Sequence, residues 1–326
     1  MTTRVEVLQP AGRTRVWVPA PLTIVTPYQT TLGNAFHADG GSANFVEQAA
    51  FGIGIVAAEW PEGVKPVLTL TSRVVTREFA VDLSQTMAAG SRTADPAVLK
   101  RFLEPTSFVP TDGIVKETAE KITRGARTDI EKARAIYDWI VENTFRDPKT
   151  RGCGLGDIRF ILESKNLGGK CADLNALFVG LARASGLPAR DAYGIRVAPS
   201  ARGFKSLGAA TSTITKAQHC RAEVYLAGHG WVPVDPADVR KVVLEEPPGN
   251  LSLSDEKVRR ARASLFGSWE MNWIAFNFGS DVELPGSTRG KLPFFMYPQA
   301  ETASGRLDSL DADAFRYEIT SAPVAM

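Results

Sequence analysis

Residues 168–190 read GGKCADLNALFVGLARASGLPAR and contain a clear helix signal. Apolar residues recur at the i, i+3, i+4, i+7, i+8 spacing of one helical face, namely Leu174, Leu177, Phe178, Leu181 and Ala182. Gly186 followed by Leu187 and Pro188 is typical of a helix end. We therefore predict a buried helix over about residues 171–185, entered from two glycines that allow a close backbone approach.

This helix begins with a cysteine. Cys171 stands where loop becomes helix, so free backbone N–H groups and the positive end of the helix dipole both favour its thiolate, and Lys170 adds to that bias. The alternative is a small buried residue on the inner face of the helix, but the preceding glycines favour a nucleophile. Asp173 is better interpreted as a first-turn charge that complements the helix dipole than as a catalytic acid.

A cysteine nucleophile needs a base, and the chain has three histidines. His37 lies in a β-rich region and His229 in a glycine-flanked turn, so both are predicted to be surface residues. His219 begins a predicted strand after a polar loop. A histidine in a strand is more often structural than catalytic, so its position relative to an acid decides the interpretation.

Three strands are predicted after the helix, at residues 190–197, 219–226 and 231–235. The glycine-containing turn between the last two places Asp235 opposite about residue 221, two positions from His219. Such neighbours on paired strands lie roughly 5–8 Å apart at their Cβ atoms, close enough for a carboxylate to fix the imidazole tautomer. Cys171, His219 and Asp235 are therefore the candidate triad, and a helix followed by an antiparallel sheet predicts an α+β fold.

These residues also resemble a known family. Residues 168–190 are similar to the nucleophile helix of the transglutaminase-like superfamily, and residues 219–236, HCRAEVYLAGHGWVPVDP, are similar to its histidine and aspartate strands. The resemblance covers about residues 110–245. Arg221 departs from the family pattern, which usually has tryptophan two residues after the histidine. The difference concerns the shape of the site on the side where the acceptor would bind.

The resemblance implies a papain-like transglutaminase core, in which a nucleophile helix packs on an antiparallel sheet. It also implies that the Cys171 thiolate attacks a carboxamide of a peptide or protein, and that water or an amine resolves the thioester, as in a peptidase, an amidase or a transglutaminase. The oxyanion would need the Cys171 backbone N–H and an upstream donor, for which Asn143 and Asn166 are candidates.

The alternative is a catalytically inactive binding or scaffold module, but the intact Cys, His and Asp set favours an enzyme.

The rest of the chain predicts four regions. Residues 1–87 are expected to form an all-β domain, and residues 88–112 a linker with at most one short helix. Residues 113–250 form the catalytic core, including a helix over about residues 128–143 that begins with a capping box of Thr128 and Glu131. Residues 251–326, with a helix over 254–266, complete or pack on that core. The loop over residues 199–218 is expected to be either a lid or disordered.

Composition limits the partners and cofactors. The 326 residues include 38 Lys and Arg against 36 Asp and Glu, a net charge of +2, which gives no reason to expect nucleic acid or an anionic membrane as a partner. The longest apolar stretch, residues 49–58, is shorter than the ~18 residues of a membrane-spanning helix. The sequence leaves the oligomeric state open.

The three cysteines include no CxxC pair, and a zinc site of Cys153, Cys220 and His219 is a weak alternative. The glycines of residues 152–156 lack dinucleotide-binding spacing and predict a turn into a helix at Asp157. No loop has calcium-binding spacing, so we predict no cofactor and no metal. Replacing Cys153 or Cys220 by alanine is expected to change activity little.

The first ten residues, MTTRVEVLQP, contain no signal-peptide pattern. The expected location is the cytoplasm if Met1 is the native start, and the periplasm or the cell exterior if a signal peptide was removed.

Overall fold

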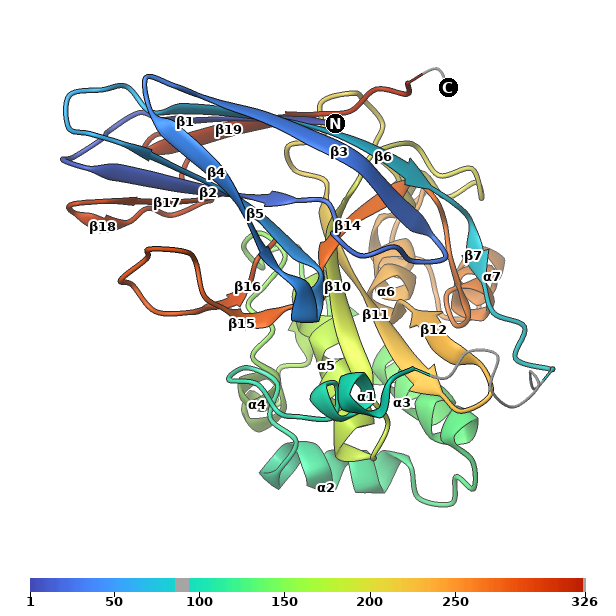
Figure 1. Ribbon diagram of the computed structural model, residues 1–326. Helices are drawn as coiled ribbons and strands as arrows, with labels where there is room; N and C mark the ends of the chain where they lie inside the picture. Colours follow the sequence, from blue (N-terminus) through green and yellow to red (C-terminus); the bar gives the residue numbers. More distant parts are fainter. Residues whose placement is uncertain (86–93, 325–326) are drawn as a thin grey trace.

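The computed structural model of the chain describes residues 1–85 and 94–324 (Figure 1). It confirms the predicted α+β class: a β-rich half lies at the top of Figure 1, and a half in which helices pack on an antiparallel sheet lies below it. The predicted boundary between residues 87 and 88 lies outside the described residues, so the domain limits stay predictions.

The central sheet has the antiparallel strand order β12-β11-β10-β14. Its strands are β10 (Ala189–Arg196), β11 (Gln218–Leu226), β12 (Gly230–Val234) and β14 (Trp273–Asn277). Helix α5 (Cys171–Ala184) packs on β10 and β11. Apolar side chains from the N-terminal half, among them Leu22 and Tyr28, pack with Trp273 and Ala192 of the sheet. Every residue of β10 is buried as a result.

Helix α5 is the centre of the helical half. Leu174, Leu177, Phe178 and Leu181 are fully buried, as their spacing predicts. The capping box of Thr128 and Glu131 is present at the start of the helix that it predicted, α3. Four helices pack on α5, namely α2 (Gly113–Ile122), α3 (Asp129–Asn143), α4 (Ile158–Ser164) and α6 (Pro236–Glu245). The other helices described are α1 (Pro96–Arg101) and α7 (Glu256–Ser264), which packs on α6.

The β-rich half contains two sheets, of order β19-β1-β6-β3 and β18-β17-β2-β5-β4. Their apolar side chains share one core, which includes Val5, Val18, Val56 and Leu70. The strands are β1 (Thr2–Val7), β2 (Thr14–Ala20), β3 (Gln29–Asp39), β4 (Ser42–Gln48), β5 (Ile53–Trp60), β6 (Val67–Thr76), β17 (Gln299–Thr302), β18 (Gly305–Arg306) and β19 (Phe315–Thr320). Short 3₁₀ helices lie at Ala49–Phe51 and Lys205–Leu207.

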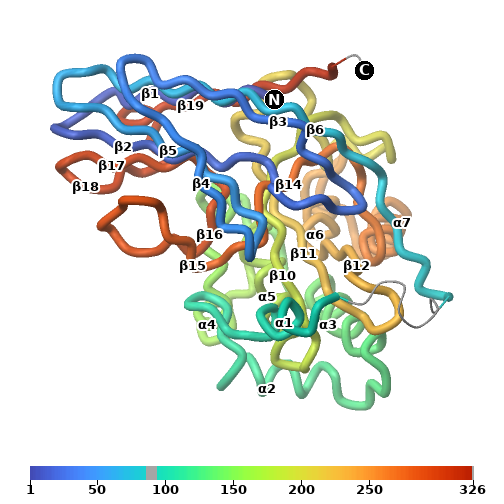
Figure 2. Tube along the Cα trace, viewed as in Figure 1, coloured from blue at the N-terminus to red at the C-terminus, as the bar shows by residue number. Residues whose placement is uncertain are grey.

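The last part of the chain is divided between the two halves. Strand β14 joins the central sheet beside β10, whereas β17 pairs with β2 and β19 pairs with β1. Figure 2 accordingly shows the red end of the trace beside its blue start. Unpaired strand edges favour such additions, because each exposes a row of backbone N–H and C=O groups. Residues beyond 251 thus complete both halves.

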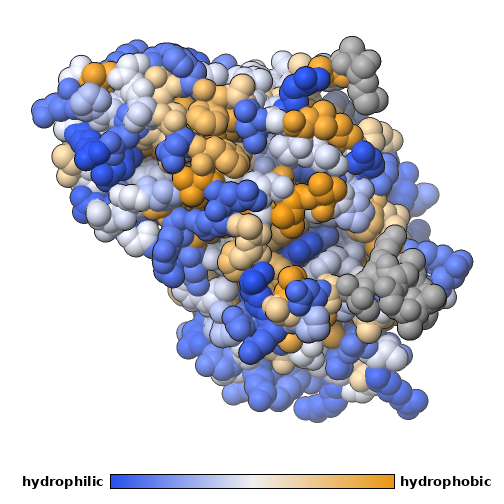
Figure 3. Space-filling view, in the orientation of Figure 1, coloured by the Kyte–Doolittle hydropathy of each residue, from blue (hydrophilic) through white to orange (hydrophobic). Residues whose placement is uncertain are grey.

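Three short strand pairs lie outside these sheets. They are β7 (Phe79–Ala80) with β13 (Ser268–Trp269), β15 (Ser280–Val282) with β16 (Leu292–Phe294), and β8 (Phe145–Arg146) with β9 (Gly168–Gly169). The last pair is parallel and places Arg146 beside the entry to α5. Hydrophilic side chains dominate the lower end of the face in Figure 3. Within the described residues, no helix is long and apolar enough to cross a membrane.

Candidate active site

The thiol of Cys171 lies at the first turn of α5 and is 3% exposed. Gly169 is required just before it, since a Cβ there would lie 2.5 Å from the Asp173 Cβ. The Asp173 carboxylate accepts hydrogen bonds from the backbone N–H of Leu155 and Gly156, both at 3.0 Å, and of Lys170, at 2.9 Å. Asp173 therefore fastens the preceding loop to the helix start, which agrees with its interpretation as a structural first-turn charge.

His219 and Asp235 lie side by side on neighbouring strands. The His219 Nε2 atom is 2.7 Å from Asp235 Oδ2. Ala222 pairs with Val234 across the hairpin, so the chain register places Asp235 level with residue 221, as predicted. Asp235 is fully buried, and its Oδ1 accepts the backbone N–H of Asp238 at 3.0 Å. Asp235 thus both caps α6 and contacts the imidazole.

Two residues that sequence reasoning missed hold this pair in place. Asn175 Nδ2 donates to Asp235 Oδ1 at 3.2 Å and to the Cys220 carbonyl at 2.8 Å. Asn175 follows Cys171 by one helical turn, a spacing that is visible in the sequence. Trp273 Nε1 donates to the His219 carbonyl at 2.8 Å from the neighbouring part of the sheet, and no local pattern indicated this contact.

A second carboxylate, also missed, lies behind the imidazole. Asp238 Oδ1 is 3.4 Å from His219 Nε2, and the Arg196 guanidinium lies 2.6 and 2.7 Å from the two Asp238 oxygens. Burial acts to raise the pKa of Asp238, but Arg196, His219 and Lys241 together outweigh it and hold that pKa far below its usual value. Asp238 therefore stays ionised. In the sequence, the sign that could have indicated Asp238 is its position three residues after Asp235.

The two carboxylates set the charge of the imidazole. Burial and Arg196 act to lower the pKa of His219, but Asp238 and Asp235 outweigh them, so that pKa is raised. Burial and the neighbouring Asp238 raise the pKa of Asp235, against the opposing effect of His219. The arrangement therefore stabilises an imidazolium, which is the partner that a thiolate requires.

All three cysteines gather at the start of α5. Hydrogen bonds from Cys153 and Cys220 lower the pKa of Cys171 far below its usual value, with a further contribution from His219 and against the effect of burial. The Cys153 carbonyl accepts the backbone N–H of Ala172 at 2.9 Å, which fixes it against the helix. Segments far apart in sequence thus bring both thiols beside Cys171. The expectation that replacing Cys153 or Cys220 by alanine changes activity little stays a prediction.

We expect the Cys171 thiol of the Cys153→Ala variant to ionise at higher pH, because a hydrogen bond that stabilises the thiolate is lost. The rate of alkylation by iodoacetamide, measured against pH, reports this pKa. Cys153→Ser is the matched control, because serine keeps a donor and should shift the curve less. Identical curves for the wild type and Cys153→Ala would contradict the contact.

The two proposed side-chain donors to the oxyanion are not at the site. Asn143 Nδ2 donates to the Trp139 carbonyl at 2.8 Å, and Asn166 is exposed, with its Oδ1 accepting the Gly168 N–H. Neither lines the cleft at Cys171. Both expectations are wrong, because α3 and the loop before β9 turn these amides away. The Cys171 backbone N–H remains suitable, since no preceding helical turn can accept it.

The other two histidines lie away from the cleft. His37 is exposed and contacts Asp39 at 3.0 Å, which confirms its prediction as a surface residue. His229 is 4% exposed, so the prediction of a surface position is wrong. The segment after β7 brings Asp82 into electrostatic contact with this ring, and nothing in the local sequence indicates that packing.

Arg221 occupies the position where tryptophan is usual. Its guanidinium lies 4.8 Å from the Trp273 ring centroid and 5.5 Å from that of Trp269, while Nη1 donates to the Glu270 carbonyl at 3.0 Å. Burial lowers the pKa of Arg221 to about 10, so it stays charged at neutral pH. Its Nε is 3.9 Å from Asp235 Oδ2. Arg221 therefore adds positive charge beside the aspartate instead of lining the cleft.

The segment between β10 and β11 forms a wall of the cleft. Two buried carboxylates hold it: Glu270 accepts Ser200 Oγ at 2.7 Å, and Glu246 accepts both the N–H and the Oγ of Ser206, at 2.9 and 2.7 Å. Residues 215–217 then line the cleft. A movement of this segment as a lid stays a prediction.

The donor set of the site also bears on metals. In the described part of the chain, one group of potential metal ligands has its atoms within 4.8 Å of one another, and it consists of His219, Asp235 and Asp238. This group includes no cysteine. Arg196 already bonds to both Asp238 oxygens, so a cation would have to displace a guanidinium. The alternative zinc site of Cys153, Cys220 and His219 is not among the groups of described residues that meet this distance.

A buried carboxyl on β10 is expected to make stability depend on pH. Burial raises the pKa of Asp191 from 3.8 to about 7. The folded state then holds the proton more tightly than the unfolded state, so stability is lost as pH rises from about 4 to 7, by at most about 4 kcal/mol at 1.36 kcal/mol per pKa unit. We expect Asp191→Asn to remove this loss. Urea unfolding of the wild type and of Asp191→Asn at pH 5 and pH 8 measures this loss of stability. The same pH dependence in both proteins would contradict the prediction.

Comparisons with known proteins show what the chain is similar to. Residues 116–236 match the sequence pattern of the Transglutaminase-like superfamily. An uncharacterized protein of Haemophilus influenzae is 36% identical over 323 residues, which cover 95% of this chain and 86% of the relative. A candidate cysteine protease from Cytophaga hutchinsonii has a similar structure, with a TM-score of 0.54 at 18% identity over 86% of this chain and 91% of its own. The periplasmic domain of TgpA from Pseudomonas aeruginosa aligns over 72% of this chain and 90% of its own, with a TM-score of 0.36 at 14% identity.

Proposed function

The chain belongs to the transglutaminase-like superfamily, and from that membership we propose that it is a thiol-dependent enzyme that acts on amide bonds of peptides or proteins through an acyl-enzyme at Cys171. The observation that carries the proposal is the position of His219, between the buried Asp235 and the thiol of Cys171. Because Nε2 contacts the carboxylate, Nδ1 is the nitrogen that exchanges a proton with the thiol.

The proposed reaction has two halves. The Cys171 thiolate attacks the amide carbonyl, the C–N bond breaks, and the His219 imidazolium donates its proton to the departing amine or ammonia. His219 then removes a proton from water or from an acceptor amine, which attacks the thioester and releases the thiolate. Asp235 keeps the imidazole oriented and stabilises its charged form throughout. The Cys171 backbone N–H stabilises the oxyanion.

Hydrolysis and amine transfer use the same thioester and the same base, so products distinguish them. The test is mass spectrometry of the wild-type protein incubated with peptides that carry glutamine and lysine. Fragments would indicate a peptidase, deamidated glutamine an amidase, and crosslinks with loss of ammonia a transglutaminase. No product from any peptide would count against the proposal.

Alkylation separates an enzyme from a scaffold of the same fold. A reactive nucleophile predicts rapid, single-site labelling of Cys171 by iodoacetamide at neutral pH. Cys153 and Cys220 provide the internal comparison, because both are buried and hydrogen bonds to Cys171 together with burial raise their pKa values. Equally slow labelling of all three thiols would support the scaffold instead.

A further inference from the structure

The cleft at Cys171 is walled by positive charge. In the described part of the chain, no aspartate or glutamate lines it. Its charged lining residues come from separate segments and are Arg146, Arg151, Lys170, Arg196, Lys216 and Lys241. A chain with a net charge of only +2 gives no reason to expect this concentration. The charge is therefore a property of the site and not of the composition.

Nearby carboxylates balance only part of this charge. Arg196 pairs with Asp238, Arg151 pairs with Asp308, and Arg146 pairs with Glu245. Lys241 shares the same glutamate, with its Nζ 3.7 Å from Glu245 Oε2.

Neither Lys170 nor Lys216 has a carboxylate within ion-pair distance among the described residues. Three carboxylates outside the lining therefore face six cations, and the cleft keeps a surplus of positive charge.

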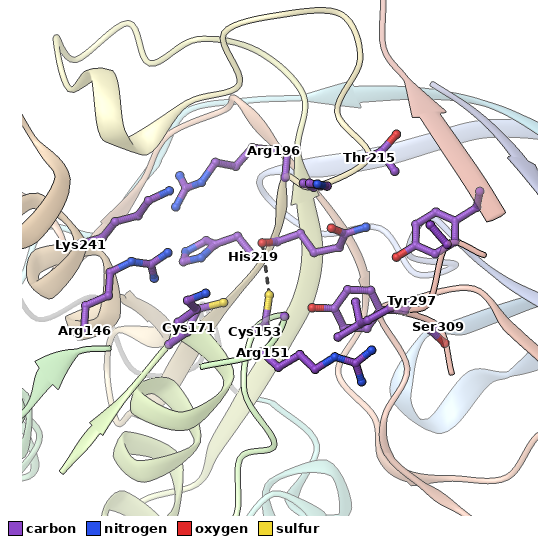
Figure 4. A pocket seen from close by; sticks show the side chains of 18 of the residues that line it. Arg146, Arg151, Cys153, Cys171, Arg196, Thr215, His219, Lys241, Tyr297 and Ser309 are labelled. Atoms are coloured by element: carbon purple, nitrogen blue, oxygen red, sulfur yellow. Dashed lines mark hydrogen bonds between the residues drawn. The ribbon is translucent and has the colours of Figure 1, made fainter. Parts of the chain in front are cut away.

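The cations surround the reacting pair. In Figure 4, Lys241 and Arg146 lie on one side of His219 and Cys171, whereas Arg151 lies on the other side with Tyr297 and Ser309. Gln218 also lines the cleft, and its buried Nε2 has no hydrogen-bond partner within the described chain. An unpaired buried donor is costly unless a ligand accepts its hydrogen bond. The cleft thus offers cations and a free amide donor around the nucleophile.

We propose that this cleft selects acidic peptides, in which aspartate or glutamate side chains flank the amide that reacts at Cys171. The inference rests on the proposed function, because that function supplies the amide. Carboxylates near the amide would meet the unbalanced cations between low-dielectric walls, where the attraction is stronger than in bulk water. A peptide fits better than a nucleic acid, because Cys171 requires a carboxamide and nucleic-acid backbones have none.

Binding without turnover gives the first test. The full chain with Cys171→Ala is titrated against three fluorescein-labelled peptides: Ala-Glu-Glu-Gln-Glu-Glu-Ala, its serine-for-glutamate version and its lysine-for-glutamate version. Fluorescence anisotropy should show the acidic peptide binding roughly tenfold or more tightly than the serine peptide, with an advantage that shrinks as salt increases. Equal affinity for the acidic and serine peptides would overturn the inference.

Charge removal inside the cleft gives the second test. Lys216→Gln and Lys241→Gln should each weaken binding of the acidic peptide several-fold and leave the serine peptide unaffected. The matched control is Lys116→Gln, since Lys116 is exposed on α2 and does not line the cleft. An equal effect of all three substitutions would attribute the preference to net charge and overturn a specific role of the cleft.

Turnover by the wild-type protein separates this inference from the proposed function. Higher kcat/KM for the acidic peptide supports both, whereas equal kcat/KM for the acidic and serine peptides overturns the substrate preference alone. Tight binding of an acidic peptide that is never processed keeps the preference and contradicts the proposed function. Tighter binding of a labelled oligoadenylate than of the acidic peptide would assign the cleft to nucleic acid and overturn the inference.

Discussion

Cys171→Ala is expected to remove amide-directed activity, with a loss of roughly 10⁴-fold or more in rate, while the protein stays folded. The loss is large because no thioester can form without the thiol. The fold should persist, because alanine has the highest helix propensity and Cys171 occupies the first residue of α5. The measurements are product formation from a peptide that the wild type processes, and thermal unfolding.

The matched control for this variant is Cys220→Ala. Cys220 is also a buried thiol and contacts Cys171, so its removal makes the same chemical change without removing the nucleophile. We expect that control to keep measurable activity and to raise the pKa of Cys171. Comparable activity in the wild type and Cys171→Ala would exclude Cys171 as the nucleophile.

Asp235→Asn is expected to lower the rate by roughly 10³- to 10⁴-fold, by analogy with other triads, with a smaller effect on KM than on kcat. The amide cannot stabilise the imidazolium and can support the wrong tautomer. The protein should still fold, because an asparagine side chain can also accept the Asp238 N–H that Asp235 accepts at the start of α6. Alkylation of Cys171 should shift to higher pH, since a less basic imidazole stabilises less thiolate.

The chain contains a matched control for this prediction. His37 and Asp39 form an exposed pair at 3.0 Å, so Asp39→Asn makes the same change in a histidine–carboxylate contact outside the site. That variant should match the wild type in rate and in alkylation. Superimposable alkylation curves for the wild type and Asp235→Asn would remove Asp235 from the mechanism and leave it the role of a helix cap.

The sequence predicted the parts of the site that depend on local patterns. Helical spacing located the buried face of α5 and placed Cys171 at its first turn, and hairpin register placed Asp235 beside His219. These inferences succeed because a helical face and a two-strand register involve residues that are close in the chain. The α+β class follows from the same elements.

What escaped prediction depends on contacts between distant segments. Arg196 and Asp238 form a buried ion pair from a strand and a helix, and each alone resembles an ordinary charged residue in the sequence. Cys153 reaches Cys171 because a glycine-containing loop folds back on the helix start. The basic wall of the cleft is assembled in the same way. Charge balance over the whole chain hides such clusters, because their compensating carboxylates lie elsewhere.

The pairing of β19 with β1 and of β17 with β2 has a consequence for synthesis. A ribosome releases β1 and β2 long before it makes β19 and β17, which cover their edges. Until then each nascent chain carries two open strand edges, which are the usual starting points of intermolecular pairing and aggregation. The order of the strands along the chain therefore leaves the edges of β1 and β2 open until β19 and β17 have been made.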